Sequence, residues 1–254
     1  MGDLQFSGRT ALVTGSTSGI GEAVARAFAA QGAKVVVSGR DVERGNKVVN
    51  AIRAAGGVAD FLAVDLAGSA ESIRQFAAAA EKALGGRIDI LVNNAAIYPA
   101  APTHALRDEE VDAMLAVNIR APHVLVAWLA PKMAERKSGT IVNIGSWMAK
   151  VGSPVAVLYA ASKAALEQLT RGWAAEYGRG GVHVNTVAPG VTLTPGNEAY
   201  KAMLDAMTAN TPAGSVVHPK NIADAVLFLS SPAATFLHGT SLNVDGGITA
   251  TRLA

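Results

Sequence analysis

Short apolar runs alternate along this chain with longer stretches in which apolar residues recur every three or four positions. The short runs are rich in valine and isoleucine, as in the buried strands of a parallel sheet. They predict strands at 10–14, 33–38, 58–64, 88–92, 140–144, 182–187 and 240–244. The longer stretches carry the period of amphipathic helices. This alternation predicts an α/β fold with a doubly wound, Rossmann-type, mainly parallel sheet of about seven strands.

The helical stretches have recognisable ends. Gly32 follows the apolar face of the first one and is placed to end it. A further run begins at Asp108 and contains Pro122 and Pro131, which predict a kink or a break. The remaining helices are predicted at 42–55, 70–84, 155–177 and Pro219–Leu229.

No repeat, linker or low-complexity tract divides the chain, so we expect one domain spanning residues 1–254. Only the segment 191–217 departs from the regular pattern, because it mixes prolines, methionines and polar residues. We interpret this segment as an insertion of one or two short helices that serves as a mobile lid over the substrate.

Composition narrows the possible functions. Half of the residues are hydrophobic (50%) and 17% are charged, which supports a well-buried core. A formal charge of +2 without a basic cluster argues against a nucleic-acid partner. The absence of cysteine excludes disulfide and thiol chemistry and fits a reducing compartment. No secretory signal and no apolar run of roughly 18 residues is evident, so we expect a cytoplasmic protein without a membrane span.

A glycine-rich turn follows the first predicted strand and leads into the first helix. Its residues are Gly15, Ser16, Thr17, Ser18, Gly19, Ile20 and Gly21. Because another strand follows, the unit is βαβ, and it places backbone N–H groups and a positive helix end where a pyrophosphate binds. The spacing differs from G-x-G-x-x-G, and such a turn can be purely structural, but the context favours cofactor binding.

Polar residues and glycines follow several other predicted strands directly. They are Asp65, Asn93, Ser146 and the pair Pro189-Gly190. Because the carboxyl ends of parallel strands meet at one edge of the sheet, these residues are predicted to gather at a single site.

Tyr159 and Lys163 are four residues apart in a predicted helix, which places them on the same face. A phenol, with a pKa of about 10, exchanges protons poorly near neutrality, and a neighbouring cation lowers that pKa. The pair therefore predicts a general acid–base group, and the hydroxyl of Ser146 is placed to bind the reacting oxygen. The spacing alone also fits a helical tyrosine beside an exposed lysine.

The whole ordered set resembles the short-chain dehydrogenase/reductase family over essentially the full chain. The matching residues are Thr14-Gly-x-x-x-Gly-x-Gly21, Asp65, Asn93-Asn94-Ala95, Asn118, Ser146, Tyr159-x-x-x-Lys163 and Pro189-Gly190. The resemblance implies that Tyr159 is the acid–base group and that Ser146 orients the substrate oxygen. It implies that Lys163 lowers the pKa of Tyr159 and holds the nicotinamide ribose, and that Asn118 kinks its helix and anchors a water leading to Lys163.

The resemblance also implies a nicotinamide dinucleotide cofactor. Asp65 would meet the adenine, Asn93 would brace the central strands, and Thr194 would hold the carboxamide or the pyrophosphate. Ala96 stands where the family often has glycine, and its methyl would narrow the space beside the ribose without abolishing binding. The cofactor-binding residues expected outside the glycine turn are Ser38, Arg40, Asp65, Leu66, Asn93, Ala95, Tyr159, Lys163, Pro189, Gly190, Thr192 and Thr194.

The end of the second predicted strand indicates which cofactor is used. NAD-specific relatives place a carboxylate there for the ribose hydroxyls, but this chain has Gly39. Asp41 is expected to cap the next helix, and Arg40 offers a planar fork to a 2′-phosphate. NADP(H) is therefore favoured over NAD(H), although an arginine at this loop is also compatible with simple exposure.

The substrate pocket is expected to be largely apolar and to lack a cation that would bind a carboxylate or phosphate. Its candidate residues are Tyr98, Trp147, Met148, Val151, Leu193, Met203 and Met207. An uncharged or hydrophobic ketone or secondary alcohol fits this lining, while Met203 and Met207 fit equally well as anchors of a lid helix. The five histidines lack metal-ligand spacing, so no metal is expected.

These observations predict an NADP(H)-dependent oxidoreductase that interconverts a ketone and a secondary alcohol by hydride transfer. A 3-oxoacyl-thioester reductase, acting on acyl carrier protein, is the nearest alternative. A cofactor-bound scaffold or redox sensor without turnover is an alternative of another class. The resemblance further implies a homotetramer in which the helices holding Asn118 and Tyr159 contact a neighbouring subunit.

Overall fold

The computed structural model describes residues 4–251, so both ends of the predicted 1–254 domain lie outside the described residues. A single sheet of seven strands runs through the molecule in the order β3-β2-β1-β4-β5-β6-β7. The strands are β1 (Thr10–Val13), β2 (Lys34–Gly39), β3 (Val58–Ala63), β4 (Ile90–Asn93), β5 (Gly139–Ile144), β6 (Val182–Pro189) and β7 (Ser241–Val244). Every neighbouring pair is parallel. The predicted doubly wound α/β fold is therefore confirmed.

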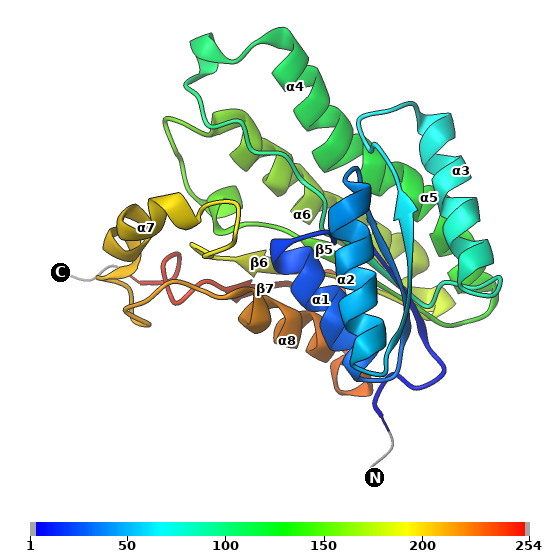
Figure 1. The fold of residues 1–254 in the computed structure, drawn as a ribbon. Helices are drawn as coiled ribbons and strands as arrows, with labels where there is room; N and C mark the ends of the chain where they lie inside the picture. Colours follow the sequence, from blue (N-terminus) through cyan, green and yellow to red (C-terminus); the bar gives the residue numbers. More distant parts are fainter. Residues whose placement is uncertain (1–3, 252–254) are drawn as a thin grey trace.

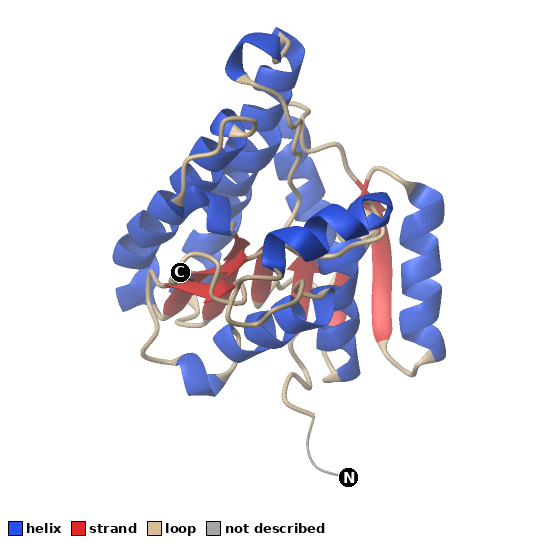
Figure 2. Cartoon of the chain, turned by 90° about the vertical axis from the view of Figure 1, so that its left-hand side faces the viewer, coloured by secondary structure: helices blue, strands red, loops and turns tan. Residues whose placement is uncertain are grey.

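Helices cover both faces of this sheet (Figures 1 and 2). They are α1 (Gly19–Ala30), α2 (Val42–Ala54), α3 (Ala70–Ala83), α4 (Asp108–Leu115), α5 (Ala121–Glu135), α6 (Val157–Tyr177), α7 (Lys201–Thr208) and α8 (Pro219–Leu229). The apolar residues of α1, α2 and α8 pack on one face, and those of α3, α5 and α6 pack on the other. Gly32 ends α1 as predicted, with a φ of +90° just beyond the capping residue.

Each strand feeds both cores because its side chains alternate between the two faces. In β1, Ala11 and Val13 belong to the core under α1 and α8, whereas Leu12 belongs to the core under α5 and α6. All three side chains are fully buried. This burial from both sides explains why the strands appear in the sequence as continuous apolar runs and do not alternate with polar residues.

The helical run that begins at Asp108 is continuous, so of the predicted kink or break at its prolines, the break is wrong. A π-helical turn, Ala116–Arg120, joins α4 to α5, and Pro122 lies in the first turn of α5. A proline is tolerated there because the first-turn N–H groups have no partner within the helix. The local distortion therefore falls around Asn118, one turn before the proline, and Pro131 sits inside α5 without ending it.

The same composite helix, Asp108–Glu135, bears on the expectation that no apolar stretch of the chain is long enough to span a membrane. It has 28 residues and contains an 18-residue window of mean hydropathy 1.4, so its length and composition alone would allow it to cross a membrane. However, 61% of that window is buried within the fold. The apolar character of this helix is thus accounted for mainly by packing against α3 and α6.

The predicted insertion 191–217 contains one short turn of 3₁₀ helix, Glu198–Tyr200, followed by α7. It has a small apolar cluster of its own, separate from the two main cores. We call this the lid cluster; it consists of Val191, Leu204 and Val216 with Trp147, Leu193 and Ile248 packed against them. Trp147 comes from the loop after β5, so the lid rests directly on the segment that follows Ser146.

Candidate active site

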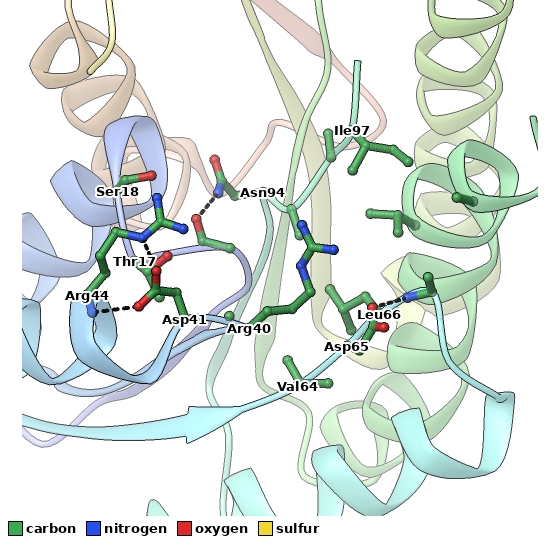
Figure 3. A pocket seen from close by; sticks show the side chains of 17 residues that line it. Thr17, Ser18, Arg40, Asp41, Arg44, Val64, Asp65, Leu66, Asn94 and Ile97 are labelled. Atoms are coloured by element: carbon green, nitrogen blue, oxygen red, sulfur yellow. Dashed lines mark hydrogen bonds and ion pairs between the residues drawn. The ribbon is translucent and has the colours of Figure 1, made fainter. Parts of the chain in front are cut away.

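A cavity of about 360 Å³ opens at the carboxyl ends of β1, β2, β3 and β4 (Figure 3). It lies where the strand order reverses between β1 and β4, which is the usual ligand site of doubly wound sheets. The residues that line it are Gly15, Thr17, Ser18, Gly39, Arg40, Asp41, Arg44, Val64, Asp65, Leu66, Ala67, Asn94, Ala95, Ala96, Ile97, Ala113 and Val117.

The glycine turn forms one wall of this cavity and leaves no room for side chains. Gly15 and Gly19 have φ values of +62° and +58°, which glycine adopts readily. A Cβ at Gly21 would lie 2.4 Å from the carbonyl oxygen of Gly15 and 2.5 Å from the side chain of Asn94. Ser18 caps α1 by position but its side chain makes no capping hydrogen bond, so the N–H groups of the first turn remain available. This cradle fits the pyrophosphate of a dinucleotide.

Ser16 and Ser38 lie beneath the glycine turn, and this differs from the prediction that they contact the cofactor. Both are fully buried. The hydroxyls of both donate to the carbonyl oxygen of Val13, at 2.7 Å from Ser16 and 3.1 Å from Ser38. The N–H of Ser38 also donates to the Ser16 hydroxyl at 2.9 Å. These side chains therefore hold the turn in place from behind.

Two arginines enter the cavity from the segment after β2, and only Arg40 was predicted from the sequence. Asp41 caps α2 as predicted, because its carboxylate accepts from the N–H of Arg44 at 2.9 Å and from Nε of Arg44 at 2.7 Å. These hydrogen bonds, the backbone one first, lower the pKa of Asp41. The guanidinium of Arg40 makes no hydrogen bond or ion pair to residues 4–251, so it is free to meet an anionic ligand.

The remaining predicted cofactor residues fall into two groups. Asp65, Leu66 and Ala95 line the cavity, as does Ala96. Asn93 instead lies buried behind it, where its side-chain N–H group donates to Asn143 across the β4–β5 pair at 2.8 Å.

Thr192 and Thr194 begin the lid next to the glycine turn. The Thr192 hydroxyl donates to the carbonyl oxygen of Gly190 at 2.9 Å. The Thr194 methyl lies 3.5 Å from where a Cβ at Gly19 would be. Gly190, which follows Pro189 at the end of β6, passes so close to Asp245 that a Cβ would lie 2.5 Å from its Cα. The segment 191–217 therefore leaves the sheet next to the glycine turn.

Tyr159 and Lys163 lie on one face of α6, as the spacing predicts, with Nζ of Lys163 5.7 Å from the centroid of the Tyr159 ring. Lys163 is 2% exposed, and its ammonium donates to the carbonyl oxygen of Ile144 at 2.8 Å. The ammonium is thus held at the carboxyl end of β5, next to the loop that carries Ser146.

The pKa of Tyr159 differs from the prediction. Burial raises it to about 12, a side-chain hydrogen bond with Ser146 lowers it, and the nearby Tyr98 raises it. Burial also lowers the pKa of Lys163 to about 8. The expected lowering of the Tyr159 pKa by Lys163 does not appear, because the ammonium points at Ile144 and desolvation of the phenol dominates.

Ser146 follows β5 and starts the 3₁₀ turn Trp147–Lys150. Its side-chain oxygen accepts a hydrogen bond from the N–H of Met148 at 3.2 Å. Because that bond uses a lone pair, the hydroxyl keeps its one proton, which it donates to the Tyr159 oxygen and for which a bound substrate oxygen would compete.

Asn118 uses its side chain in a way that the resemblance did not imply. Its Oδ1 accepts from the N–H of Ile97 at 2.9 Å, and its Nδ2 donates to the Ile97 carbonyl at 3.1 Å and to the Ser162 hydroxyl at 3.0 Å. Ser162 in turn donates to the backbone oxygen of Tyr159 at 2.7 Å. The π-helical turn thus ties the loop after β4 to the catalytic helix. Neither Ile97 nor Ser162 carries a sequence signal for this role.

The structure brings only some of the predicted pocket residues next to Tyr159. The ring of Tyr98 packs edge to face on Tyr159, with 4.6 Å between centroids. Trp147 and Leu193 pack in the lid cluster. Met203 and Met207 lie on α7 and are 55% and 44% exposed. The other two, Met148 and Val151, lie partly buried in and just after the 3₁₀ turn.

The chain matches a family model described as "Enoyl-(Acyl carrier protein) reductase" over residues 15–249. It is 37% identical to an uncharacterized oxidoreductase of Thermotoga maritima, over 97% of this chain and 100% of that protein. It is 39% identical to the cis-4-hydroxycyclohexanecarboxylate dehydrogenase of Sinomonas cyclohexanicum, over 96% and 98%. It is 32% identical to the 3-oxoacyl-[acyl-carrier-protein] reductase of Thermotoga maritima, over 96% and 99%.

Solved structures agree with these relatives. A structure described as a short chain dehydrogenase/reductase family protein is 44% identical, with a TM-score of 0.89 over 97% of this chain and 100% of that chain. A putative NAD(P)-dependent gluconate 5-dehydrogenase from Beutenbergia cavernae, with bound NADP, is 39% identical, with a TM-score of 0.90 over 98% and 100%.

Proposed function

The chain belongs to the short-chain dehydrogenase/reductase family, and from that premise we propose that it is an NADP(H)-dependent oxidoreductase that interconverts a ketone and a secondary alcohol. The family consists of NAD(P)-dependent enzymes that act on CH–OH groups. The observation that carries the proposal is the position of Tyr159, which shares a helix face with Lys163 and lies beside Ser146 and Tyr98. Tyr98 directly follows Ile97, which lines the glycine-walled cavity.

In the direction of ketone reduction, Tyr159 acts as the proton donor. Its pKa of about 12 keeps the phenol protonated near neutrality. Ser146 donates a hydrogen bond to the substrate oxygen, and Tyr159 transfers its proton as negative charge develops there, an effect of about 10²–10⁴-fold in rate. The nicotinamide, when bound, supplies or accepts the hydride. In alcohol oxidation the same residues act in reverse.

Lys163 supports both steps because its charge lies on the same face of α6. One of its N–H groups is used by Ile144, which leaves two donors for a ribose hydroxyl or for the phenolate. With a pKa of about 8 the side chain is mostly charged at neutral pH. A cation at this place stabilises the phenolate that remains after proton transfer.

NADP(H) is the cofactor that the cavity favours. Arg40 has a free guanidinium that fits a 2′-phosphate, and Gly39 leaves no carboxylate to bind an unmodified ribose. The solved relative from Beutenbergia cavernae contains NADP. NAD(H) is the alternative, and comparing the two cofactors under the same conditions distinguishes them.

The substrate side favours an uncharged or hydrophobic molecule. Tyr98 is half-exposed next to Tyr159, and the methionines of α7 are exposed on the lid. Cyclopentanol dehydrogenases of Comamonas are among the relatives, at 34% identity, and their named substrate is an uncharged alicyclic alcohol, which supports this class. A 3-oxoacyl-thioester reductase is the second candidate, supported by the relative from Thermotoga maritima.

Helix α5 supports a homotetramer as a further part of the proposal. Most of its apolar residues pack inside the fold, but Ala127 and Pro131 are exposed on its outer face, together with His123. A helix of this kind is stable when both its faces are covered. Light scattering on the purified protein measures the assembly directly.

A substrate panel followed at the nicotinamide absorbance tests the proposed reaction. Cyclic ketones, open-chain ketones, sugars and acyl thioesters are each assayed with NADPH and NADH. We expect turnover of ketones with NADPH, and its loss in Tyr159→Phe with cofactor binding retained. Equal turnover in Tyr159→Phe would refute the mechanism. Faster turnover of acyl thioesters would favour the second candidate, and cofactor binding without any turnover would favour a scaffold.

A further inference from the structure

Tyr98 stands against the acid–base phenol in a defined geometry. The two ring centroids are 4.6 Å apart and the ring planes meet at 71°, an edge-to-face contact. Pairs of this kind contribute about 0.5–1.5 kcal/mol beyond the apolar area that they bury. Tyr98 comes from the loop between β4 and α4, so this contact joins the loop to α6.

A chain of hydrogen bonds fixes the backbone next to Tyr98 relative to the backbone of Tyr159. Asn118 binds both the N–H and the carbonyl of Ile97, the residue directly before Tyr98. It also donates to Ser162, which donates to the backbone oxygen of Tyr159. The hydrogen bonds therefore fix the two ends of the aromatic contact relative to one another. Tyr98 is thus positioned by the fold and does not depend on the lid.

Tyr98 also presents a free surface. It is 49% exposed, and its hydroxyl makes no hydrogen bond within the part of the chain that the structure describes. A substrate oxygen must come within about 3 Å of the Tyr159 hydroxyl to receive its proton. The carbon skeleton attached to that oxygen then lies against the ring of Tyr98.

We propose that Tyr98 is a specificity-determining residue that selects alicyclic ketones and secondary alcohols over open-chain polyhydroxylated ones. This inference rests on the proposed function and names the substrate class of the same site. An aromatic wall contacts the faces and edges of a saturated ring over a large area at little entropic cost. Apart from its own hydroxyl the Tyr98 side chain offers no hydrogen-bond partner, so a polyhydroxylated chain packed on the ring face would lose hydrogen bonds to water without replacing them, which is unfavourable.

The test compares two six-carbon ketones, cyclohexanone and 2-hexanone, and a four-carbon polyhydroxylated ketone. kcat and KM are measured with NADPH for the wild type, Tyr98→Phe and Tyr98→Ala. Phe236→Ala is the matched control, because Phe236 is 97% exposed and lies in the loop before β7, at the amino ends of the strands, whereas Tyr98 follows the carboxyl end of β4.

The wild type should prefer cyclohexanone over both open-chain ketones. Tyr98→Ala should reduce that preference in kcat/KM by about tenfold or more, the usual value of one well-placed pocket contact. Tyr98→Phe should keep the preference, because it keeps the ring, and the control should leave it unchanged. An unchanged preference in Tyr98→Ala, or a wild type that prefers the polyhydroxylated ketone, would overturn the inference.

A second measurement separates failure of this inference from failure of the proposed function. Tyr98 raises the pKa of Tyr159, so Tyr98→Phe should lower that pKa, as read from carbon-13 NMR of labelled tyrosine side chains. This readout does not need turnover. If the wild type reduces no ketone, the proposed function fails; if it reduces ketones but Tyr98→Ala leaves the preference for cyclohexanone unchanged, only the role of Tyr98 fails.

Discussion

Removal of the Arg40 guanidinium should change the cofactor preference of this protein more than any other single substitution in the cavity. Arg40 reaches into the cavity between the glycine turn and Asp65 without a partner in residues 4–251 (Figure 3). A hydrogen bond to a charged group contributes about 1.5–3 kcal/mol. Because about 1.4 kcal/mol corresponds to a factor of ten, Arg40→Gln should raise the KM for NADPH by about 10- to 150-fold.

The change should be specific to the phosphorylated cofactor, because NADH has no group for Arg40 to bind there. Steady-state kinetics with both cofactors, at constant ionic strength, measure the ratio of the two kcat/KM values. Arg44→Gln should change that ratio less, because the guanidinium of Arg44 is already bound by Asp41 at 2.7 Å. Arg53→Gln is the control on α2, since Arg53 pairs with Asp60 at 2.8 Å, outside the cavity. If Arg40→Gln and Arg53→Gln gave the same ratio as the wild type, the assignment of the 2′-phosphate site would be wrong.

A carboxylate introduced at Gly39 is a less direct test of the same assignment. A Cβ there would lie 2.8 Å from the methyl of Thr17, which belongs to the glycine turn. Gly39→Asp would therefore disturb the turn as well as the charge. Arg40→Gln changes the charge while leaving the backbone of the cradle in place.

Three further predictions follow from the contacts around the site. Asn118→Ala should lower the free energy of unfolding by about 2–4 kcal/mol, because it leaves the N–H and carbonyl of Ile97 without partners and removes the donor to the Ser162 hydroxyl. Chemical denaturation measures this, and a loss below 1 kcal/mol, on the order of a single neutral hydrogen bond, would argue against a structural clamp. Gly21→Ala should weaken NADPH binding, because its Cβ would lie 2.4 Å from the carbonyl oxygen of Gly15 in the glycine turn. Fluorescence titration measures the affinity, and an unchanged affinity would show that the glycine turn is not the binding site. The kcat/KM for NADPH should fall as pH rises through about 8, because Lys163 is charged below its lowered pKa and neutral above it; a profile that stays flat to about two units above that pKa would contradict this role of the ammonium.

The fold could be predicted because its signals are local. Valine-rich runs such as those of β1 and β2 are buried on both faces, and helix ends such as Gly32 and Asp41 have the side chains or conformations that ends require. The π-helical turn around Asn118 could not be predicted. Its position depends on how α4 and α5 pack, and Pro122 marks it only one turn late.

Site residues could be predicted where the residue type itself supplies the chemistry. They could not be predicted where their role depends on how the elements pack against one another. Tyr159 and Lys163 follow from their spacing, but the direction of the Lys163 ammonium toward Ile144 depends on the depth of α6 against the sheet. Ser38 was predicted to contact the cofactor because it lies near the end of a strand. Residues on both faces of a doubly covered strand are buried, however, and Ser38 is one of them. Arg44 was missed because the capping geometry of Asp41 brings it to the cavity.

The lid cluster stabilises the segment 191–217 through apolar contacts that are separate from the two large cores. Only Trp147 and Ile248 join it from outside residues 191–217. An exchange of this segment between relatives therefore has to match these two side chains, the Gly246-Gly247 turn next to Pro212 and Ala213, and the core contact of Val217, while the sheet, the glycine turn and Tyr159 stay as they are. A fold arranged in this way can acquire new substrates by revising one short stretch of chain, without re-optimising the machinery that moves the proton.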